Sequence, residues 1–106
     1  MRLCLLINPT DHWQHAVKYA HQLAMATEDK HQLIGVFFYG TAANIITDSQ
    51  EQSKWQSLAK TPLYICRTMM DDFKLSDESL EQAFTVIGMA PWIGLMEQAD
   101  RIVEII

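Results

Sequence analysis

Cys66 is the residue of this 106-residue chain whose type and position best suit chemistry. The run Pro62–Cys66 predicts a strand, with proline tolerated at its first position and cysteine at its last. Functional groups in an open parallel sheet gather beyond the carboxyl ends of the strands. A thiol there can lie at the start of a following helical turn, where backbone N–H groups and the Arg67 side chain favour the thiolate. Position alone leaves a nucleophile and a buried structural thiol both open.

The other cysteine, Cys4, lies in the middle of an apolar run and is interpreted as structural. Desolvation there raises the pKa of a thiol, and neighbouring side chains block access to it. Because no second cysteine lies close to Cys66 in sequence, the signature of a dithiol redox pair is missing. A single reactive cysteine suits the carriage of a chemical group.

Metal and nucleotide sites find little support in the sequence. His12 and His15 are three residues apart on one predicted helix without an obvious third ligand, and His21 lies on a different side of that helix. The glycines form neither a P-loop nor a G-x-G-x-x-G motif. We therefore expect no metal and no cofactor.

Composition narrows the class of protein. Hydrophobic residues make up 49% of the chain and charged residues 20%, as in ordinary globular domains. The length predicts one domain over residues 1–106. A net charge of −5 disfavours direct binding of nucleic acid. No apolar run approaches the ~20 residues that a membrane span needs, and two cysteines without a leader segment fit the cytoplasm.

The elements that position Cys66 follow from the hydrophobic pattern. Apolar runs predict five strands, at residues 2–8, 32–39, 62–66, 84–87 and 100–106, the last of them at an edge. Helical spacing runs from Asp11 to about Met25, where Asp11 and Gln14 are a candidate capping box. Beyond a loop through Ala43 and Asn44, a second candidate capping box, Asp48 with Glu51, precedes a short helix. Its packing residues are Trp55, Leu58 and Ala59.

Shorter helical pieces complete the pattern. Residues 67–72 read as a turn or short helix, residues 76–82 as one or two helical turns, and residues 91–98 as a helix with proline in its first turn. Strands that alternate with helices imply a three-layer α/β/α sandwich around a mostly parallel five-stranded sheet. The carboxyl edge of that sheet would hold Asn8, Tyr39 and Arg67 as supporting residues around Cys66.

Four segments, taken in order, resemble the DsrE/TusD family of sulfur-relay proteins, and TusD-like members most closely. They are Val36-Phe-Phe-Tyr39, Leu63-Tyr-Ile-Cys66, Ala83-Phe-Thr-Val-Ile-Gly88 and Ala99-Asp-Arg-Ile-Val103. The similarity spans nearly the whole chain. Two segments depart from the family pattern: the stretch from Cys66 to Phe84 is shorter than in TusD-like chains, and residues 8–13 lack glycine.

The resemblance implies a sulfurtransferase function for Cys66. In that family the cysteine after the third strand carries a persulfide, so Cys66 would accept sulfane sulfur from a donor protein and pass it to an acceptor protein. Family members serve tRNA 2-thiouridine formation or sulfur oxidation, and they assemble as homo- or hetero-oligomers of DsrE-like subunits. The alternative that the sequence leaves open is a non-catalytic structural or adaptor subunit in which Cys66 is inert.

Overall fold

Five parallel strands form one sheet in the order β4-β3-β2-β1-β5 in the computed structural model, which describes residues 1–58 and 60–106. The strands are β1 (Arg2–Ile7), β2 (Gln32–Phe38), β3 (Leu63–Cys66), β4 (Phe84–Ile87) and β5 (Arg101–Ile105). The α-helices are α1 (Trp13–Thr27), α2 (Ser49–Trp55), α3 (Arg67–Asp72) and α4 (Met89–Gln98), and the 3-10 helices are η1 (Gly40–Thr47) and η2 (Asp77–Ser79).

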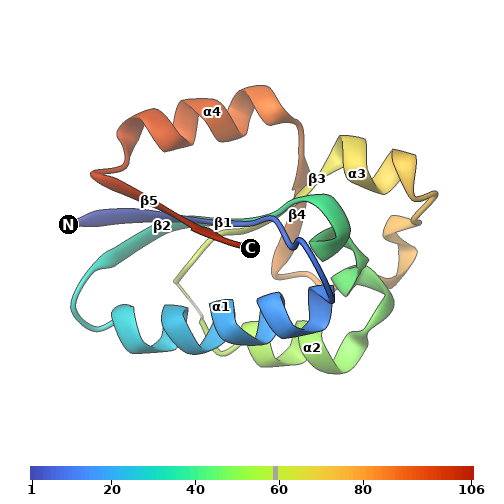
Figure 1. The fold of residues 1–106 in the computed structure, drawn as a ribbon, viewed down its shortest axis with the longest axis horizontal. Coiled ribbons are helices and arrows are strands. Elements are labelled where there is room, and N and C mark those ends of the chain that lie inside the picture. Colours follow the sequence, from blue (N-terminus) through green and yellow to red (C-terminus); the bar gives the residue numbers. More distant parts are fainter. Residues whose placement is uncertain (59) are drawn as a thin grey trace.

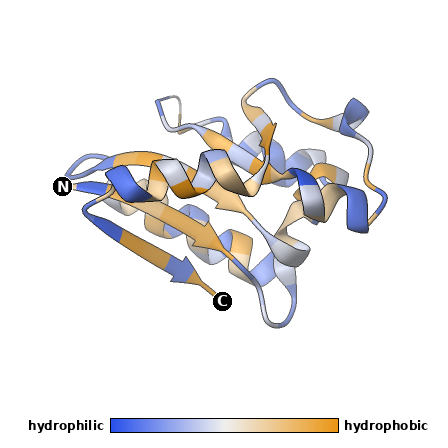
Figure 2. Cartoon of the chain, turned by 90° about the horizontal axis from the view of Figure 1, so that it is seen from above, coloured by the Kyte–Doolittle hydropathy of each residue, from blue (hydrophilic) through white to orange (hydrophobic). Residues whose placement is uncertain are grey.

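Helices cover the two faces of the sheet unequally (Figure 1). α4 lies alone along one face, and α1 and α2 lie on the other. The central strands are buried from both sides, which explains why β1 and β2 read as nearly continuous apolar runs. Figure 2 shows the hydrophobic residues concentrated along these strands. The predicted three-layer α/β/α architecture and the parallel sheet, with β5 at an edge, are confirmed.

Each face has its own hydrophobic core. The larger core lies between the sheet and the side that carries α1, η1 and α2, and it includes Val17, Val36 and Ile65. The smaller core lies under α4 and consists of four buried residues. These are Cys4, Phe37, Cys66 and Trp92. Both cysteines therefore face the thinner, single-helix side of the sheet.

The helix-start predictions had different outcomes. α1 begins at Trp13, and its N-cap, His12, makes no capping hydrogen bond from its side chain, so the Asp11–Gln14 capping box was wrong. At α2, Asp48 is the N-cap as predicted, and its Oδ1 accepts hydrogen bonds from the backbone N–H groups of Gln50 and Glu51, both at 3.1 Å. Trp55 and Leu58 are buried as expected. The packing prediction for Ala59 lies outside the described residues.

The loop expected through Ala43 and Asn44 is instead the 3-10 helix η1, whose residues Ala42, Ala43, Ile45 and Ile46 are buried. Its first residue, Gly40, has a φ of +58°. A Cβ atom there would lie 2.9 Å from Oδ1 of Asn8, so the tight start of η1 favours glycine on both counts. An eight-residue 3-10 helix has no 3.6-residue period, which is why the sequence pattern did not reveal it.

Candidate functional site

Cys66 is the last residue of β3 and the N-cap of α3, as the sequence predicted. Its backbone is extended, with φ −69° and ψ 122°, and its side chain makes no capping hydrogen bond to α3. The residue is 1% exposed. The thiol therefore lies at the carboxyl edge of the sheet but beneath other side chains. A reagent reaches the sulfur only after those side chains move.

The side chains around Cys66 are apolar and aromatic. Cys66 pairs with Ile87 of β4. The pairing of Phe38 with Ile65 brings Tyr39, one residue further on, beside Cys66 on the β2 side. The ring of Phe37 stacks with those of Trp92 and Tyr39, with centroid distances of 4.7 and 6.1 Å. These rings form one wall of the small core that contains the thiol.

The supporting residues named from the sequence do not all gather at the thiol. Tyr39 is next to Cys66 across the β2–β3 boundary, and Arg67 follows it in the chain with an exposed side chain. Asn8 follows β1, which is two strands away from β3. Its Nδ2 donates to Oε2 of Glu104 at 3.3 Å, and its backbone N–H donates to the carbonyl of Ile105 at 2.8 Å. Asn8 thus joins β1 to β5 and does not lie in the strand pair that holds Cys66.

Sequence reasoning did not single out Phe37 or Ile87, which enclose the thiol. Phe37 precedes Tyr39 by two residues and so shares its face of β2, a signal that strand alternation contains. Ile87 lies beside Cys66 because β4 pairs with β3 in the register that sets the two residues opposite each other. That register follows from the tertiary fold, and the local sequence holds no sign of it.

Cys4 is enclosed more completely than Cys66. It lies inside β1, it is 0% exposed, and burial raises the pKa of its thiol to about 11. β1 and β3 are separated by β2, so the two cysteine backbones are at least about 9.6 Å apart at the usual strand spacing. A disulfide needs Cα atoms within about 7 Å. The two cysteines of one chain therefore cannot pair in this fold.

No group of three His, Cys, Asp or Glu side chains within residues 1–58 and 60–106 is arranged to hold a metal ion. His12 and His15 lie edge to face, with ring centroids 5.6 Å apart. Across the same part of the chain, no helix has both the length and the hydrophobicity needed to cross a membrane.

Solved structures with the same fold come from bacteria and an archaeon. A conserved protein of unknown function from Bacteroides thetaiotaomicron is 16% identical, with a TM-score of 0.76 over 98% of this chain and 94% of that one. The ychN protein from E. coli is 15% identical, with a TM-score of 0.74 over 98% and 99% of the two chains. A protein of unknown function from Methanobacterium thermoautotrophicum is 14% identical, with a TM-score of 0.71 over 97% of each.

Curated proteins yield no match to this chain. The model of the DsrE/DsrF-like family, in contrast, matches residues 1–105. This match spans every strand of the sheet and includes the edge that holds Cys66. The chain therefore belongs to the DsrE/DsrF-like family.

Proposed function

We propose that the protein is a sulfurtransferase that carries sulfane sulfur as a persulfide on Cys66. The observation that carries the proposal is the position of Cys66, the last residue of β3 and the N-cap of α3 in a chain of the DsrE/DsrF-like family. Cys4 is unsuited to the role because burial keeps its thiol protonated at neutral pH.

The transfer needs no net oxidant or reductant. The Cys66 thiolate attacks the outer sulfur of a donor persulfide, the S–S bond of the donor breaks, and the donor cysteine leaves as a thiolate. Cys66 now holds the persulfide. An acceptor thiolate then attacks the outer sulfur on Cys66, and the Cys66 thiolate is released.

Because the Cys66 thiol is buried, a donor or acceptor must first gain access to the sulfur. Cys66 is 1% exposed, whereas Arg67 and Thr68, the next two residues, are exposed on α3. We propose that a donor or acceptor protein docks at α3 and displaces the side chains over the sulfur. The Arg67 guanidinium would stabilise the thiolate during transfer, and Tyr39 would border the entrance.

The test is to incubate the protein with a persulfide donor and to search the Cys66 peptide by mass spectrometry for one added sulfur atom. We expect the adduct on wild type and on Cys4→Ser, and none on Cys66→Ser. Thiol alkylation of the native protein should likewise label Cys66 before Cys4. Absence of the adduct from wild type, or an equal adduct on Cys66→Ser, would rule the proposal out.

A second candidate function is that of a structural or adaptor subunit in a DsrE-like oligomer. The near-complete burial of Cys66 favours it, because free cysteines are commonly inert core residues. The two functions differ in the phenotype of Cys66→Ser. An adaptor would keep its assembly and its cellular function with serine at this position, whereas a carrier would keep its assembly and lose sulfur transfer.

We also propose that the donor and acceptor are cytoplasmic proteins and that the chain assembles with itself or with other DsrE-like subunits. A TusD-like role predicts loss of 2-thiouridine from tRNA in a deletion strain, measurable by mass spectrometry of nucleosides. Unchanged tRNA together with impaired growth on reduced sulfur would point to sulfur oxidation instead.

A further inference from the structure

A cavity of about 510 Å³ opens at the amino edge of the sheet, away from the edge that holds Cys66. Its lining includes the first residues of β2 and the residues that precede β3. Pro62, in that lining, is four residues before Cys66, which corresponds to about 13 Å along a strand. A molecule in the cavity therefore does not touch the thiol. The cavity is a separate feature of the molecule.

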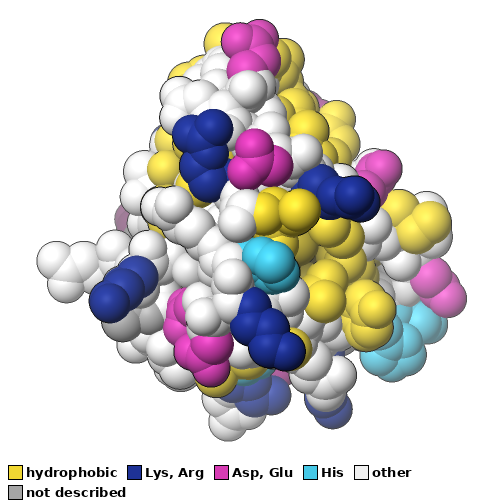
Figure 3. All heavy atoms as spheres, turned by 90° about the vertical axis from the view of Figure 1, so that its left-hand side faces the viewer, with side chains coloured by type: hydrophobic (Ala, Val, Ile, Leu, Met, Phe, Trp, Pro, Cys, Tyr) yellow, Lys and Arg dark blue, Asp and Glu magenta, His cyan; other side chains and the backbone are white. Residues whose placement is uncertain are grey.

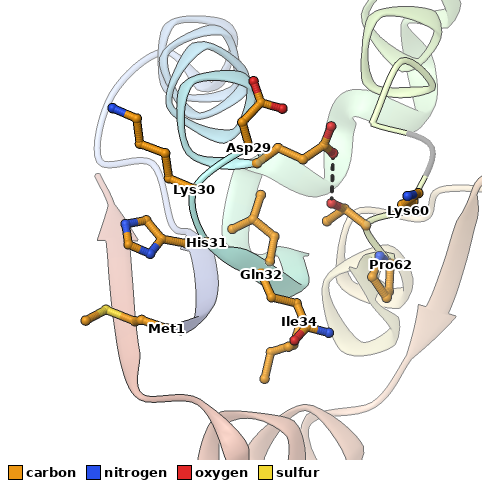
Figure 4. Close-up of a pocket in the computed structure, with 11 residues that line it drawn as sticks. Met1, Asp29, Lys30, His31, Gln32, Ile34, Lys60 and Pro62 are labelled. Atoms are coloured by element: carbon orange, nitrogen blue, oxygen red, sulfur yellow. Dashed lines mark hydrogen bonds between the residues drawn. The ribbon is translucent and has the colours of Figure 1, made fainter.

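Two segments far apart in sequence form the cavity walls (Figure 4). The turn between α1 and β2, residues 28–31, forms one wall, and residues 60–62 form the other. A hydrogen bond joins them, since Oγ1 of the buried Thr61 donates to Oε2 of Glu28 at 3.3 Å. The volume lies within the range of about 300–1,000 Å³ that small-molecule sites occupy. The cavity thus has the size of a ligand site, and the hydrogen bond between Thr61 and Glu28 holds its two walls together.

The lining carries equal numbers of lysine and carboxylate side chains. Lys30 and Lys60 come from opposite walls, and Glu28 and Asp29 supply the two carboxylates. Figure 3 views this end of the molecule and shows basic, acidic and apolar side chains intermixed on it. The apolar part of the lining includes Leu33, Ile34 and Pro62. A lining of this kind complements a molecule with one positive charge, one negative charge and an apolar body.

His31 adds a hydrogen-bond donor to the same lining. Its Nδ1 is buried and has no hydrogen-bond partner among the described residues. A buried N–H group without an acceptor is costly, so the ring proton is better placed on Nε2. An N–H at Nε2 would be a donor on the wall that also carries Lys30.

We propose that this cavity binds a small zwitterion with an apolar body, which is the chemistry of a free α-amino acid. The ligand carboxylate pairs with Lys60, the ammonium group pairs with Asp29 or Glu28, and the side chain lies against Ile34 and Pro62. The site is independent of sulfur transfer at Cys66. It would remain if Cys66 proved inert.

Three matched molecules test the charge requirement by NMR titration of the full chain. L-Leucine carries both charges, 4-methylpentanoate lacks the ammonium group, and isoamylamine lacks the carboxylate. We expect L-leucine to shift the backbone amides of residues 28–34 and 60–61 with a Kd of about 1 mM. Each analogue should bind about fivefold more weakly, because partly exposed ion pairs contribute little each.

Two variants test the walls. Lys60→Gln and Asp29→Asn should each weaken L-leucine binding about fivefold, whereas Lys74→Gln, outside the cavity, should leave it unchanged. Three results would overturn the proposal: no saturable shift by about 20 mM L-leucine, equal binding of all three molecules, or shifts that map outside the cavity. Backbone spectra of each variant verify that it is folded.

Discussion

The two cysteine side chains share one face of the sheet and differ in what surrounds them. Cys4 lies within a strand that has neighbours on both sides, and Cys66 ends a strand next to an exposed arginine. The Cys4 thiol is therefore enclosed within the sheet, whereas the Cys66 thiol is buried but is followed in the chain by an exposed residue. Sequence position anticipated this contrast, because it placed Cys4 in mid-strand and Cys66 at a strand end. Position alone left the burial of Cys66 open, because burial depends on Trp92 and Ile87, which come from later in the chain.

Removal of the Cys4 thiol should make the free energy of unfolding depend less steeply on pH in the alkaline range. Burial raises the pKa of Cys4 from 9.0 to about 11, so the folded state holds this proton more tightly than the unfolded state. The stabilisation is complete below about pH 9 and is lost as the pH rises through about 11. It amounts to about 3 kcal/mol of unfolding free energy. Urea unfolding at a series of alkaline pH values measures it.

Cys4→Ala lowers stability at every pH because it leaves a cavity, so the informative quantity is the slope against pH. We expect the slope above about pH 9 to be shallower in Cys4→Ala than in wild type. Cys66→Ala serves as the control. Parallel slopes in wild type and Cys4→Ala would show that the Cys4 thiol does not titrate differently in the folded state.

At the scale of elements, α4 approaches the sheet closely at Gly35. A Cβ atom at this position would lie 2.5 Å from Cδ2 of Leu95, 3.1 Å from Cζ3 of Trp92 and 3.2 Å from Cε2 of Tyr64. Gly35→Ala should therefore destabilise the fold by about 1–3 kcal/mol in urea unfolding, because the core has no room for the methyl group.

Gly94→Ala is the matched control, because nothing lies within 4 Å of a Cβ atom there. Gly94 lies within α4, so alanine should stabilise the helix by about 0.5–1 kcal/mol. The double variant Gly35→Ala, Leu95→Ala should recover part of the loss caused by the Gly35 substitution alone. Equal stability of Gly35→Ala and wild type would mean that α4 can move away from the sheet at little cost.

Gln52 of α2 joins three elements through one buried amide. Its Nε2 donates to the carbonyls of Ile45, Ile46 and Ser79, and its Oε1 accepts the backbone N–H of Glu81 at 2.8 Å. Gln52→Ala should cost about 2–4 kcal/mol in unfolding free energy, because several buried backbone groups lose their partner. The exposed neighbour Gln50→Ala should change stability by less than about 0.5 kcal/mol.

Hydrogen exchange distinguishes this role from a general packing effect. The Glu81 amide should exchange faster in Gln52→Ala by a larger factor than amides of β1. An equal acceleration of exchange at all amides would contradict a local role for Gln52.

The sequence pattern placed Gln52 on a predicted short helix, but its hydrogen-bond partners lie up to 29 residues away. Contacts at that separation follow only from the fold.

At the scale of the whole molecule, the side of the sheet that carries α4 is incompletely covered. α4 packs on β1 and β2. Val103 and Ile105 of β5 face the other core, so Ile102 projects on the α4 side. Ile102 is exposed, as are Met89 and Ile93 of α4. Apolar side chains gathered on one side of a small domain are typical of a contact with another subunit.

We expect Ile93→Glu to lower the assembly mass measured by light scattering, because a buried charge at an interface is costly. Met25→Glu is the matched control: Ile93 and Met25 are both 45% exposed, but Met25 lies on α1, on the opposite side of the sheet. A monomeric wild type, or an equal loss of mass in both variants, would count against this surface.

The strand order also determines when the molecule can finish folding during synthesis. β1 pairs with β5, which begins at Arg101, and the carboxylate of Asp100 accepts the backbone N–H of Arg2 at 2.7 Å. One edge of β1 thus stays unpaired on the ribosome until β5 has emerged. A contact of such long range slows folding. An exposed apolar strand edge also invites pairing with other chains, so we expect this one to be a point where nascent chains depend on chaperones.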